Sequence, residues 1–283
     1  MSMSGKDVVT MEKEFSFTEK DFKFLASLAN SKTGIVLSEQ KRDMVYGRLA
    51  RRIRALGLNS FAEYCELLSS DKADGEIGNL VNAITTNLTS FFREPHHFTH
   101  LRNYLQNFAK NPKNSRKIRL WSSASSSGME PYSMAMTLRA AIPEIDKWDA
   151  KILATDIDTN MVATGARGEY SFSDLKTVPE NCKGYIDPAT HPDKRMMSVE
   201  LKRLISFKSL NLLEDWPMKG PFQIIFCRNV VIYFDKQTKQ KLFDRMADII
   251  DPNGFLYIGH SENLNGITDR FELVDRTTYR RIK

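Results

Sequence analysis

The chain has 283 residues, of which 41% are apolar and 27% are charged, a composition typical of a globular protein. Its first fifteen residues contain no apolar stretch of signal-peptide length, and no later apolar run is long enough to cross a bilayer. Three widely spaced cysteines argue against a disulfide framework and predict a reducing, cytoplasmic location. The net charge of +6 favours an acidic partner, without choosing among nucleic acid, membrane surface and acidic protein.

The N-terminal third of the sequence is predicted to be helical. Residues 1–15 are expected to form a loose tail and residues 16–88 a basic all-helical domain. Apolar residues within Glu39–Leu56 recur at spacings of four, four and three, the pattern of one helix face, namely Val45, Leu49, Ile53 and Leu56. The same segment holds six basic and two acidic residues. Its arginines are interpreted either as a solvated face or as a binding site for an acidic partner.

The pattern changes from helices to alternating strands and helices along the rest of the chain. Residues 89–117 are predicted to form a connector with a helix at His96–Phe108, and helices are also predicted at Tyr132–Ile142, Asn160–Ala166 and Thr238–Ile250. The predicted strands are Ile118–Ser122, Lys151–Thr155, Ile205–Lys208, Phe222–Cys227, Gly254–Gly259, Phe271–Asp275 and Thr278–Ile282. This alternation predicts an α/β domain over residues 118–283, with a mostly parallel sheet, a terminal antiparallel hairpin and a small β insertion at residues 168–204.

A turn of small residues, Ser123–Gly128, joins the first predicted strand to a helix, and ligands bind at such strand ends in open α/β sheets. The turn lacks the G-x-G-x-x-G pattern, which favours a nucleoside-like ligand without phosphates over a dinucleotide. Glu130 lies beside the turn and could bind the polar end of that ligand. Asp156 ends the second strand, where an acidic residue commonly binds ribose hydroxyls. The alternative is a helix cap, for which Asp158 is the better candidate.

Four motifs occur in order along the chain: Asn87-x-Thr89-x-Phe91-Phe92-Arg93-Glu94, Gly128-x-Glu130-Pro131-Tyr132-Ser133, Cys227-Arg228-Asn229-Val230-x-Ile232-Tyr233-Phe234 and Gly259-His260-Ser261-Glu262. With these motifs the chain resembles, over nearly its whole length, the CheR-type chemotaxis receptor methyltransferases. Members of that family use S-adenosylmethionine to methylate glutamates of chemotaxis receptors. Met129 departs from the family, which usually has a second glutamate there, and we take Glu130 as the ligand position.

The resemblance implies a Rossmann-like S-adenosylmethionine-dependent methyltransferase fold with a seven-stranded sheet. It implies that the cofactor is held, without a metal, by Asn87, Thr89, Arg93, Ala124, Glu130, Asp156, Asn211, Leu212, Arg228 and Asn229. Glu130 and Asp156 have the charge to bind the ammonium group and the ribose hydroxyls of the cofactor, and which residue binds which group stays open. Arg93 and Tyr233 are the candidates to orient the substrate carboxylate, with Arg93 as a cofactor-positioning residue in the alternative.

The resemblance also suggests a partner for the arginine-rich helix. The expected partner is the cytoplasmic helical domain of methyl-accepting chemotaxis receptors, whose glutamates would attract Arg48, Arg51, Arg52 and Arg54. The insertion at residues 168–204 corresponds to the β-subdomain of the family, which in some members holds a receptor's C-terminal tail. We expect a monomer that binds no nucleic acid and does not insert into a membrane.

Rival functions rest on weaker patterns. Ser126 lies on a strand-to-helix turn like a variant nucleophile elbow, and Asp156 and His260 follow it in the order of a serine hydrolase triad. This reading leaves Glu130 and Arg228 unexplained. His96 and His100 have the spacing of metal ligands on a helix, but the sequence suggests no third ligand. A nucleic-acid methyltransferase fits the net charge, yet no N/D-P-P-Y/F motif is present.

Overall fold

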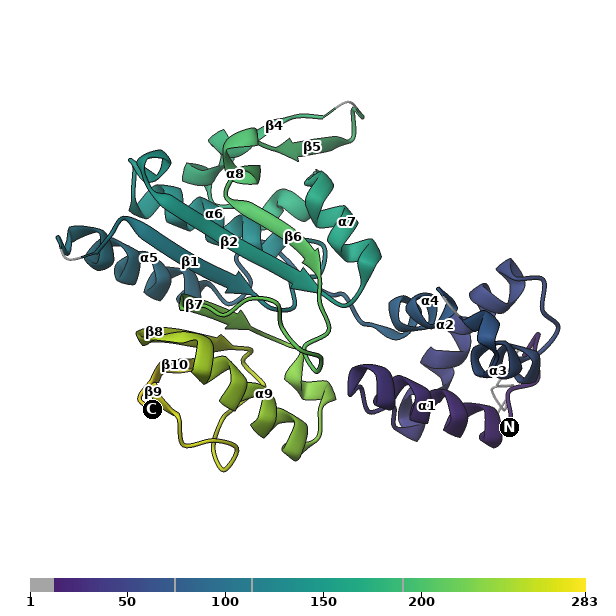
Figure 1. The fold of residues 1–283 in the computed structure, drawn as a ribbon. Coiled ribbons are helices and arrows are strands. Elements are labelled where there is room, and N and C mark those ends of the chain that lie inside the picture. Colours follow the sequence, from purple (N-terminus) through teal and green to yellow (C-terminus); the bar gives the residue numbers. More distant parts are fainter. Residues whose placement is uncertain (1–12, 74, 113, 190) are drawn as a thin grey trace, which may run out of the picture. The chain divides into compact units, whose positions relative to one another are not determined.

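The computed structural model describes residues 13–283 except 74, 113 and 190, so most of the predicted tail lies outside the described residues. The chain forms two compact units (Figure 1). One comprises the residues up to 32 together with 37–84, and the other comprises 33–36 together with 85–283. The boundary between units therefore falls between Ile84 and Thr85, inside the predicted helical range of 16–88.

The first unit is helical, as the apolar spacing predicts. Its helices are α1 (Glu19–Thr33), α2 (Arg42–Ala55), α3 (Phe61–Ser69) and α4 (Glu76–Ile84), with short 3₁₀ turns at Glu39–Lys41 and Asp71–Ala73. Ser60 caps α3 by accepting a hydrogen bond from the Glu63 amide at 3.2 Å, and Thr18 accepts the Asp21 amide at 3.2 Å before α1. Val45, Leu49 and Ile53 of α2 are buried, which confirms the predicted apolar face.

The second unit is organised on a seven-stranded sheet with the strand order β6-β2-β1-β7-β8-β10-β9. The strands are β1 (Lys117–Ser122), β2 (Asp149–Asp156), β6 (Ile205–Ser209), β7 (Phe222–Cys227), β8 (Ile250–Ile258), β9 (Phe271–Asp275) and β10 (Thr278–Arg281). The first five are parallel, whereas β10 runs antiparallel to both β8 and β9. The predicted sheet and its terminal hairpin are thereby confirmed.

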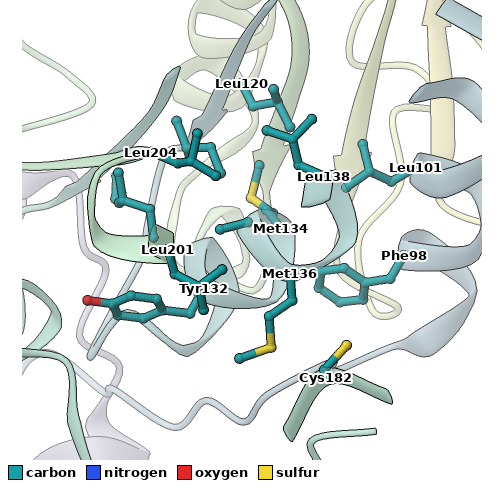
Figure 2. Close-up of a cluster of buried hydrophobic side chains, with 14 of the residues drawn as sticks. Phe98, Leu101, Leu120, Tyr132, Met134, Met136, Leu138, Cys182, Leu201 and Leu204 are labelled. Carbon is teal, nitrogen blue, oxygen red and sulfur yellow. The ribbon is translucent and has the colours of Figure 1, made fainter. Parts of the chain in front are cut away.

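Helices cover both faces of this sheet because the strand side chains alternate between two apolar cores. Ile118 and Leu120 of β1 belong to one core, whereas Trp121 belongs to the other. The first core includes side chains of α5 (Pro95–Lys110), α6 (Met129–Ala141) and α8 (Val199–Lys202); Figure 2 shows Met134, Met136 and Leu138 of α6 in this core. The second core contains the apolar face of α9 (Lys236–Ile249).

The stretch between α7 (Thr159–Arg167) and β6 contains the predicted β structure. Its strands β3 (Glu169–Ser171), β4 (Ile186–Pro188) and β5 (Lys194–Met197) form an antiparallel sheet in the order β3-β5-β4. Short 3₁₀ turns at Asp174–Thr177 and Glu180–Tyr185 connect β3 to β4. Cys182 of the second turn is buried in the same core as α5 and α6 (Figure 2), so the insertion is anchored to the main unit by apolar packing.

The largest difference between a predicted and an observed element end is at the start of β8. Strand β8 begins at Ile250 rather than Gly254, because α9 passes directly into the strand and the pairing with β7 shifts register between Phe222 and Ile224. In the part of the chain that the structure describes, no helix has the length and apolar character needed to span a membrane.

Strand β1 is the topological switch point of the sheet, since it pairs with β2 on one side and with β7 on the other. In an open α/β sheet, the loops that follow such strands diverge and leave a crevice at the carboxyl edge. The ends of β1, β2 and β7 therefore place the predicted turn, Asp156 and Arg228 at one edge of the sheet.

Candidate active site

The turn after β1 is compact because it is bonded to both neighbouring strands. The amide of Ser123 donates to the Phe226 carbonyl at 2.9 Å, and the amide of Ser125 donates to the Thr155 carbonyl at 2.8 Å. Gly128 closes the turn at φ +92°, where an added Cβ would lie 2.7 Å from the Gly165 Cα. The hydroxyl oxygen of Ser125 is buried without a hydrogen-bond partner among the described residues.

Glu130, in the first turn of α6, is buried and ion-paired. Its carboxylate accepts hydrogen bonds from the Ser122 hydroxyl at 2.7 Å and from Arg228 Nη1 at 2.8 Å. Burial raises the pKa of Glu130, and the adjacent Arg228 guanidinium opposes that rise. The end of β7 and the start of α6 are thus joined by a buried ion pair, which the sequence analysis did not anticipate.

Arg228 also binds a second carboxylate and a backbone carbonyl. Its Nη2 atom lies 3.4 Å from Glu94 Oε2, and the same nitrogen donates to the Arg93 carbonyl. Burial would raise the pKa of Glu94, but Arg228 and His260 hold that pKa below its ordinary value. Glu94 was quoted only as part of a motif in the sequence analysis, without a role. The structure shows that it is the second acidic partner of Arg228.

Asp156 lies at the carboxyl end of β2 and accepts backbone hydrogen bonds from Ser126 at 2.7 Å and from Asp158 at 2.9 Å. Burial raises the pKa of Asp156 to about 6, against the lowering effect of these two hydrogen bonds. Asp158 caps α7 by accepting the Asn160 amide at 2.9 Å, which confirms the cap assignment. Asp156 is consequently the acidic side chain at this strand end that does not cap the helix.

The connector before α5 reaches the same crevice. Asn87 Nδ2 donates to Asp158 at 2.7 Å, and the Ser126 hydroxyl donates to the Asn87 carbonyl at 2.9 Å. Arg93 is half-buried, and its Nη1 donates to the Leu88 carbonyl at 2.8 Å. Among the described residues no carboxylate is paired with Arg93. Thr89 lies between these residues and is half-buried.

The remaining predicted cofactor residues follow β1 and β6. Ala124 is half-buried in the turn after β1. The amide of Leu210 donates to the Asp156 carbonyl at 3.0 Å, which brings the next residue, Asn211, close to Asp156. The side chain of Leu212 is buried in the second core rather than exposed to the crevice edge. The structure therefore gathers the polar predicted residues near the ends of four adjacent strands, β6, β2, β1 and β7.

Tyr233 is carried by the loop that follows β7. Arg228 is buried at the start of this loop, Asn229 has a left-handed backbone with φ 58°, and Val231–Tyr233 form one 3₁₀ turn. Tyr233 is half-buried and packs against the second core. A single short segment thus sets the positions of Arg228, Asn229 and Tyr233.

A cavity of about 580 Å³ opens beside Arg93 and Glu94. It is bounded by α5, by Thr137 and Ala140 of α6, and by the 3₁₀ turns of the insertion. Glu130 and Asp156 do not line it, whereas Arg93 and Glu94, which both contact Arg228, do.

The geometry fits neither a serine hydrolase triad nor a metal site formed by His96 and His100. The Ser126 hydroxyl bonds the Asn87 carbonyl, while His260 is exposed and lies 3.1 Å from Glu94, so no serine triad is assembled from the described side chains. His100 lies 2.7 Å from the Tyr257 hydroxyl and does not share a ligand cluster with His96.

The residues that do converge as possible metal ligands are Glu94, His96 and His97. The Arg228 cation lies 3.4 Å from the same Glu94 oxygen, which makes this cluster unfavourable for a second cation.

Four arginines of α2 were predicted to bind a receptor, and three of them have partners inside the helical unit. Arg52 forms a two-pronged ion pair with buried Glu76, at 2.7 and 2.5 Å. Arg48 Nη1 donates to the Ile84 carbonyl at 3.0 Å, at the last turn of α4. Arg54 pairs with exposed Glu14, and Arg51 is exposed. Arg51 and Arg54 are the two that face solvent.

The open sheet with its terminal antiparallel hairpin, together with an acidic crevice and a small-residue turn, fits a nucleoside with a cationic amino-acid end. These features define an S-adenosylmethionine-dependent methyltransferase. Residues 87–280 match the family model for the CheR methyltransferase SAM binding domain, and residues 20–85 match the model for the CheR methyltransferase all-alpha domain. The chain belongs to the CheR methyltransferase family.

Curated relatives agree with this assignment. The chain is 44% identical over 88% of its length to a probable chemotaxis protein methyltransferase of Rhizobium etli, covering 95% of that protein. It is 41% identical to chemotaxis protein methyltransferase 2 of Pseudomonas aeruginosa, covering 99% of each chain. It is 39% identical to the chemotaxis protein methyltransferase of Salmonella typhimurium, covering 96% of this chain and 93% of that one.

Proposed function

We propose that this enzyme transfers the methyl group of S-adenosylmethionine to glutamate side chains of chemotaxis receptors in the cytoplasm, acting as a monomer. The products are the glutamate 5-O-methyl ester and S-adenosylhomocysteine. The observation that carries the proposal is that two buried carboxylates are bonded to the end of β1 and its turn, Glu130 through Ser122 and Asp156 through Ser126. Glu130 is also paired with Arg228, and the chain is matched by both CheR family models. The substrate follows from the resemblance to receptor glutamate methyltransferases and from relatives named for chemotaxis.

The two acidic residues are assigned to different ends of the cofactor by their positions. Asp156 ends the strand next to β1, the position from which an acidic side chain binds ribose hydroxyls. Glu130 lies at the start of α6 beside the Arg228 cation, and we assign it to the amino-acid end. There its negative charge attracts the ammonium group, while Arg228 neutralises part of that charge when the site is empty.

The chemistry requires no general base from the protein. S-adenosylmethionine supplies, when bound, a methyl group activated by its positive sulfur. A substrate glutamate is already ionised at neutral pH, since its reference pKa is about 4.3. The contribution of the protein is to hold the carboxylate oxygen in line with the methyl group and to exclude water. Arg93 and Tyr233 are the side chains proposed to orient that carboxylate, and Arg93 also lines the cavity beside α5.

Docking of the acidic receptor is assigned to the solvent-facing part of α2. Arg51 and Arg54 are exposed, whereas Arg52 and Arg48 are bonded to Glu76 and to the end of α4. Glu14, the partner of Arg54, is itself exposed, and such surface pairs are weak enough for a receptor carboxylate to displace them. We therefore propose that Arg51 and Arg54, rather than all four arginines, contact the receptor.

Incubating the enzyme with labelled S-adenosylmethionine and receptor-containing membranes tests the proposed function. We expect label in the receptor that mild base releases as methanol, because carboxyl methyl esters hydrolyse easily and N-methyl groups do not. Receptors with glutamines in place of the accepting glutamates serve as the control. Base-stable label, or label in nucleic acid instead, would contradict the proposal.

Reversing the charge of Arg51 and Arg54 together, as Arg51→Glu and Arg54→Glu, should raise the KM for receptor by roughly tenfold. The affinity for S-adenosylhomocysteine and the kcat at saturating receptor should stay the same, because neither arginine belongs to the unit that carries the proposed cofactor residues. Added salt should raise the KM of the wild type more than that of the variant. Arg203→Glu, an exposed charge reversal in the second unit, is the control. Equal KM values for the charge-reversed variant and the wild type would reject electrostatic docking through α2.

A further inference from the structure

Glu262 is a buried carboxylate to which the mechanism gives no task. It lies after β8, is 6% exposed, and accepts hydrogen bonds from four backbone amides. One oxygen, Oε1, accepts the amides of Val231 at 3.0 Å and Ile232 at 3.3 Å. The other, Oε2, accepts the amides of Asn229 at 3.0 Å and Gly259 at 2.6 Å. Both oxygens are therefore used, and each receives two donors.

These bonds replace regular secondary structure in the loop after β7. Three of the four amides belong to this loop, which holds only one 3₁₀ turn and cannot satisfy its own donors. Asn229 adopts a left-handed backbone at φ 58°, a conformation that asparagine tolerates better than most non-glycine residues but that its surroundings must still select. The Glu262 carboxylate selects this conformation through the Asn229 amide. Burial raises the pKa of Glu262, while the four amides favour its ionised form.

The turn that carries Glu262 fits closely against the same loop. A Cβ built on Gly259 would lie 2.9 Å from Glu262 Oε2 and 2.9 Å from the backbone nitrogen of Asn229. Only glycine therefore allows the end of β8 to approach the loop so closely. The segment Gly259–Glu262 and the loop form one rigid contact.

We propose that Glu262 is the positioning residue of the active site: its carboxylate holds the loop from Arg228 to Tyr233 in the shape that presents Asn229 to the cofactor and Tyr233 to the substrate. This inference rests on the proposed function for the roles of Asn229 and Tyr233. A neutral glutamine has a nearly identical shape but only one acceptor oxygen. In either orientation of the glutamine, its NH2 group would face two backbone N–H donors and could not accept hydrogen bonds from them.

The test is Glu262→Gln, assayed below the unfolding temperature of the variant. We expect calorimetry to show at least a tenfold loss of affinity for S-adenosylhomocysteine, and kcat to fall as well, because one of the two pairs of backbone amides, each with at least one loop amide, loses its acceptor. A merely stabilising residue would lower Tm without changing the dissociation constant or kcat of the folded enzyme. Unchanged affinity and kcat in folded Glu262→Gln would overturn the inference.

The matched control is Glu76→Gln in the helical unit. Glu76 is 7% exposed and accepts hydrogen bonds from Arg52, Tyr64 and Asn79. This substitution should lower Tm while leaving the affinity for S-adenosylhomocysteine at the wild-type value. If Glu76→Gln lost as much affinity as Glu262→Gln, the loss at Glu262 would reflect general destabilisation, and the inference would be overturned.

A measurement on the wild type covers the case in which Glu262→Gln does not fold. Hydrogen exchange in the ligand-free enzyme should find the amides of Asn229, Val231 and Ile232 as protected as those of β7. Fast exchange at these amides would show that the loop is not held and would reject the proposal. Failure of the wild type to bind S-adenosylhomocysteine would instead reject the proposed function, so the two failures are distinguishable.

Discussion

Replacing Arg228 with methionine should lower the free energy of unfolding of the second unit by about 3–5 kcal/mol. The substitution removes the cation that lies 2.8 Å from Glu130 and 3.4 Å from Glu94 and leaves both carboxylates in the protein interior. Affinity for S-adenosylhomocysteine should also fall, since Arg228 holds the Arg93 backbone through its carbonyl. Urea unfolding at neutral pH measures the effect. Tryptophan fluorescence is a suitable signal, because Trp121, Trp148 and Trp216 all belong to the second unit.

The pH dependence gives this prediction a definite sign. Without Arg228, burial raises the pKa of Glu130 and of Glu94 in the folded state above the unfolded value of about 4.3. A group with a raised folded pKa stabilises the fold at low pH and loses that contribution as the pH rises. The stability deficit of Arg228→Met should therefore be largest at neutral pH and shrink toward pH 5.

A surface arginine provides the comparison for Arg228→Met. Arg280→Met breaks a half-exposed pair with Glu272 and should cost at most about 1 kcal/mol. An equally small loss of unfolding free energy in both variants would show that the ion pairs of Arg228 with Glu130 and Glu94 do not stabilise the second unit.

The wild-type enzyme should bind S-adenosylhomocysteine progressively more weakly as the pH falls through about 6, by up to tenfold per pH unit. Burial raises the pKa of Asp156 to about 6, and protonation removes the acceptor charge that we assign to the ribose hydroxyls. Asp156→Asn should lose roughly 100-fold in affinity at neutral pH, because hydrogen bonds to a charged group contribute about 1.5–3 kcal/mol each. Its affinity should also lack the decline near pH 6. Calorimetric titrations from pH 5 to pH 8 measure both effects.

The control for Asp156 is another carboxylate that accepts backbone amides. Asp235→Asn changes the exposed cap of α9, where asparagine is nearly as good, and should keep the wild-type pH profile. If Asp156→Asn retained the decline near pH 6, a different group would be responsible, and the ribose assignment would fail.

Sequence patterns predicted the central strands of the sheet well, because these are local apolar runs that are mostly buried. Phe222–Cys227 is buried at every position and was predicted with the observed ends. The start of β8 was harder to predict, since the strand follows α9 directly and contains Pro252 and Gly254, residues that usually mark a turn. The helix caps at Ser60 and Asp158 were predictable because each bond spans only two or three residues.

Long-range contacts were not predictable from such local patterns. The Arg228–Glu130 pair joins residues 98 apart in the chain, and the Glu262 contacts with the loop after β7 join residues 30 to 33 apart. The Gly259–Glu262 motif signalled the family without revealing its task. Arginine spacing on α2 likewise gave no warning that Glu76 and the end of α4 bind two of the four side chains.

By itself, the sequence of this protein determined the α/β fold, the order of its strands along the chain and the family to which it belongs, because apolar periodicity and short motifs are local properties. Only the tertiary structure decided which charges meet: Arg228 with Glu130 and Glu94, Asp156 with the turn after β1, and Glu262 with the loop that carries Tyr233. The reason is that a buried charge is stable only when another group in the folded chain pairs with it. The strand order, which reverses at β1, decides which groups become neighbours.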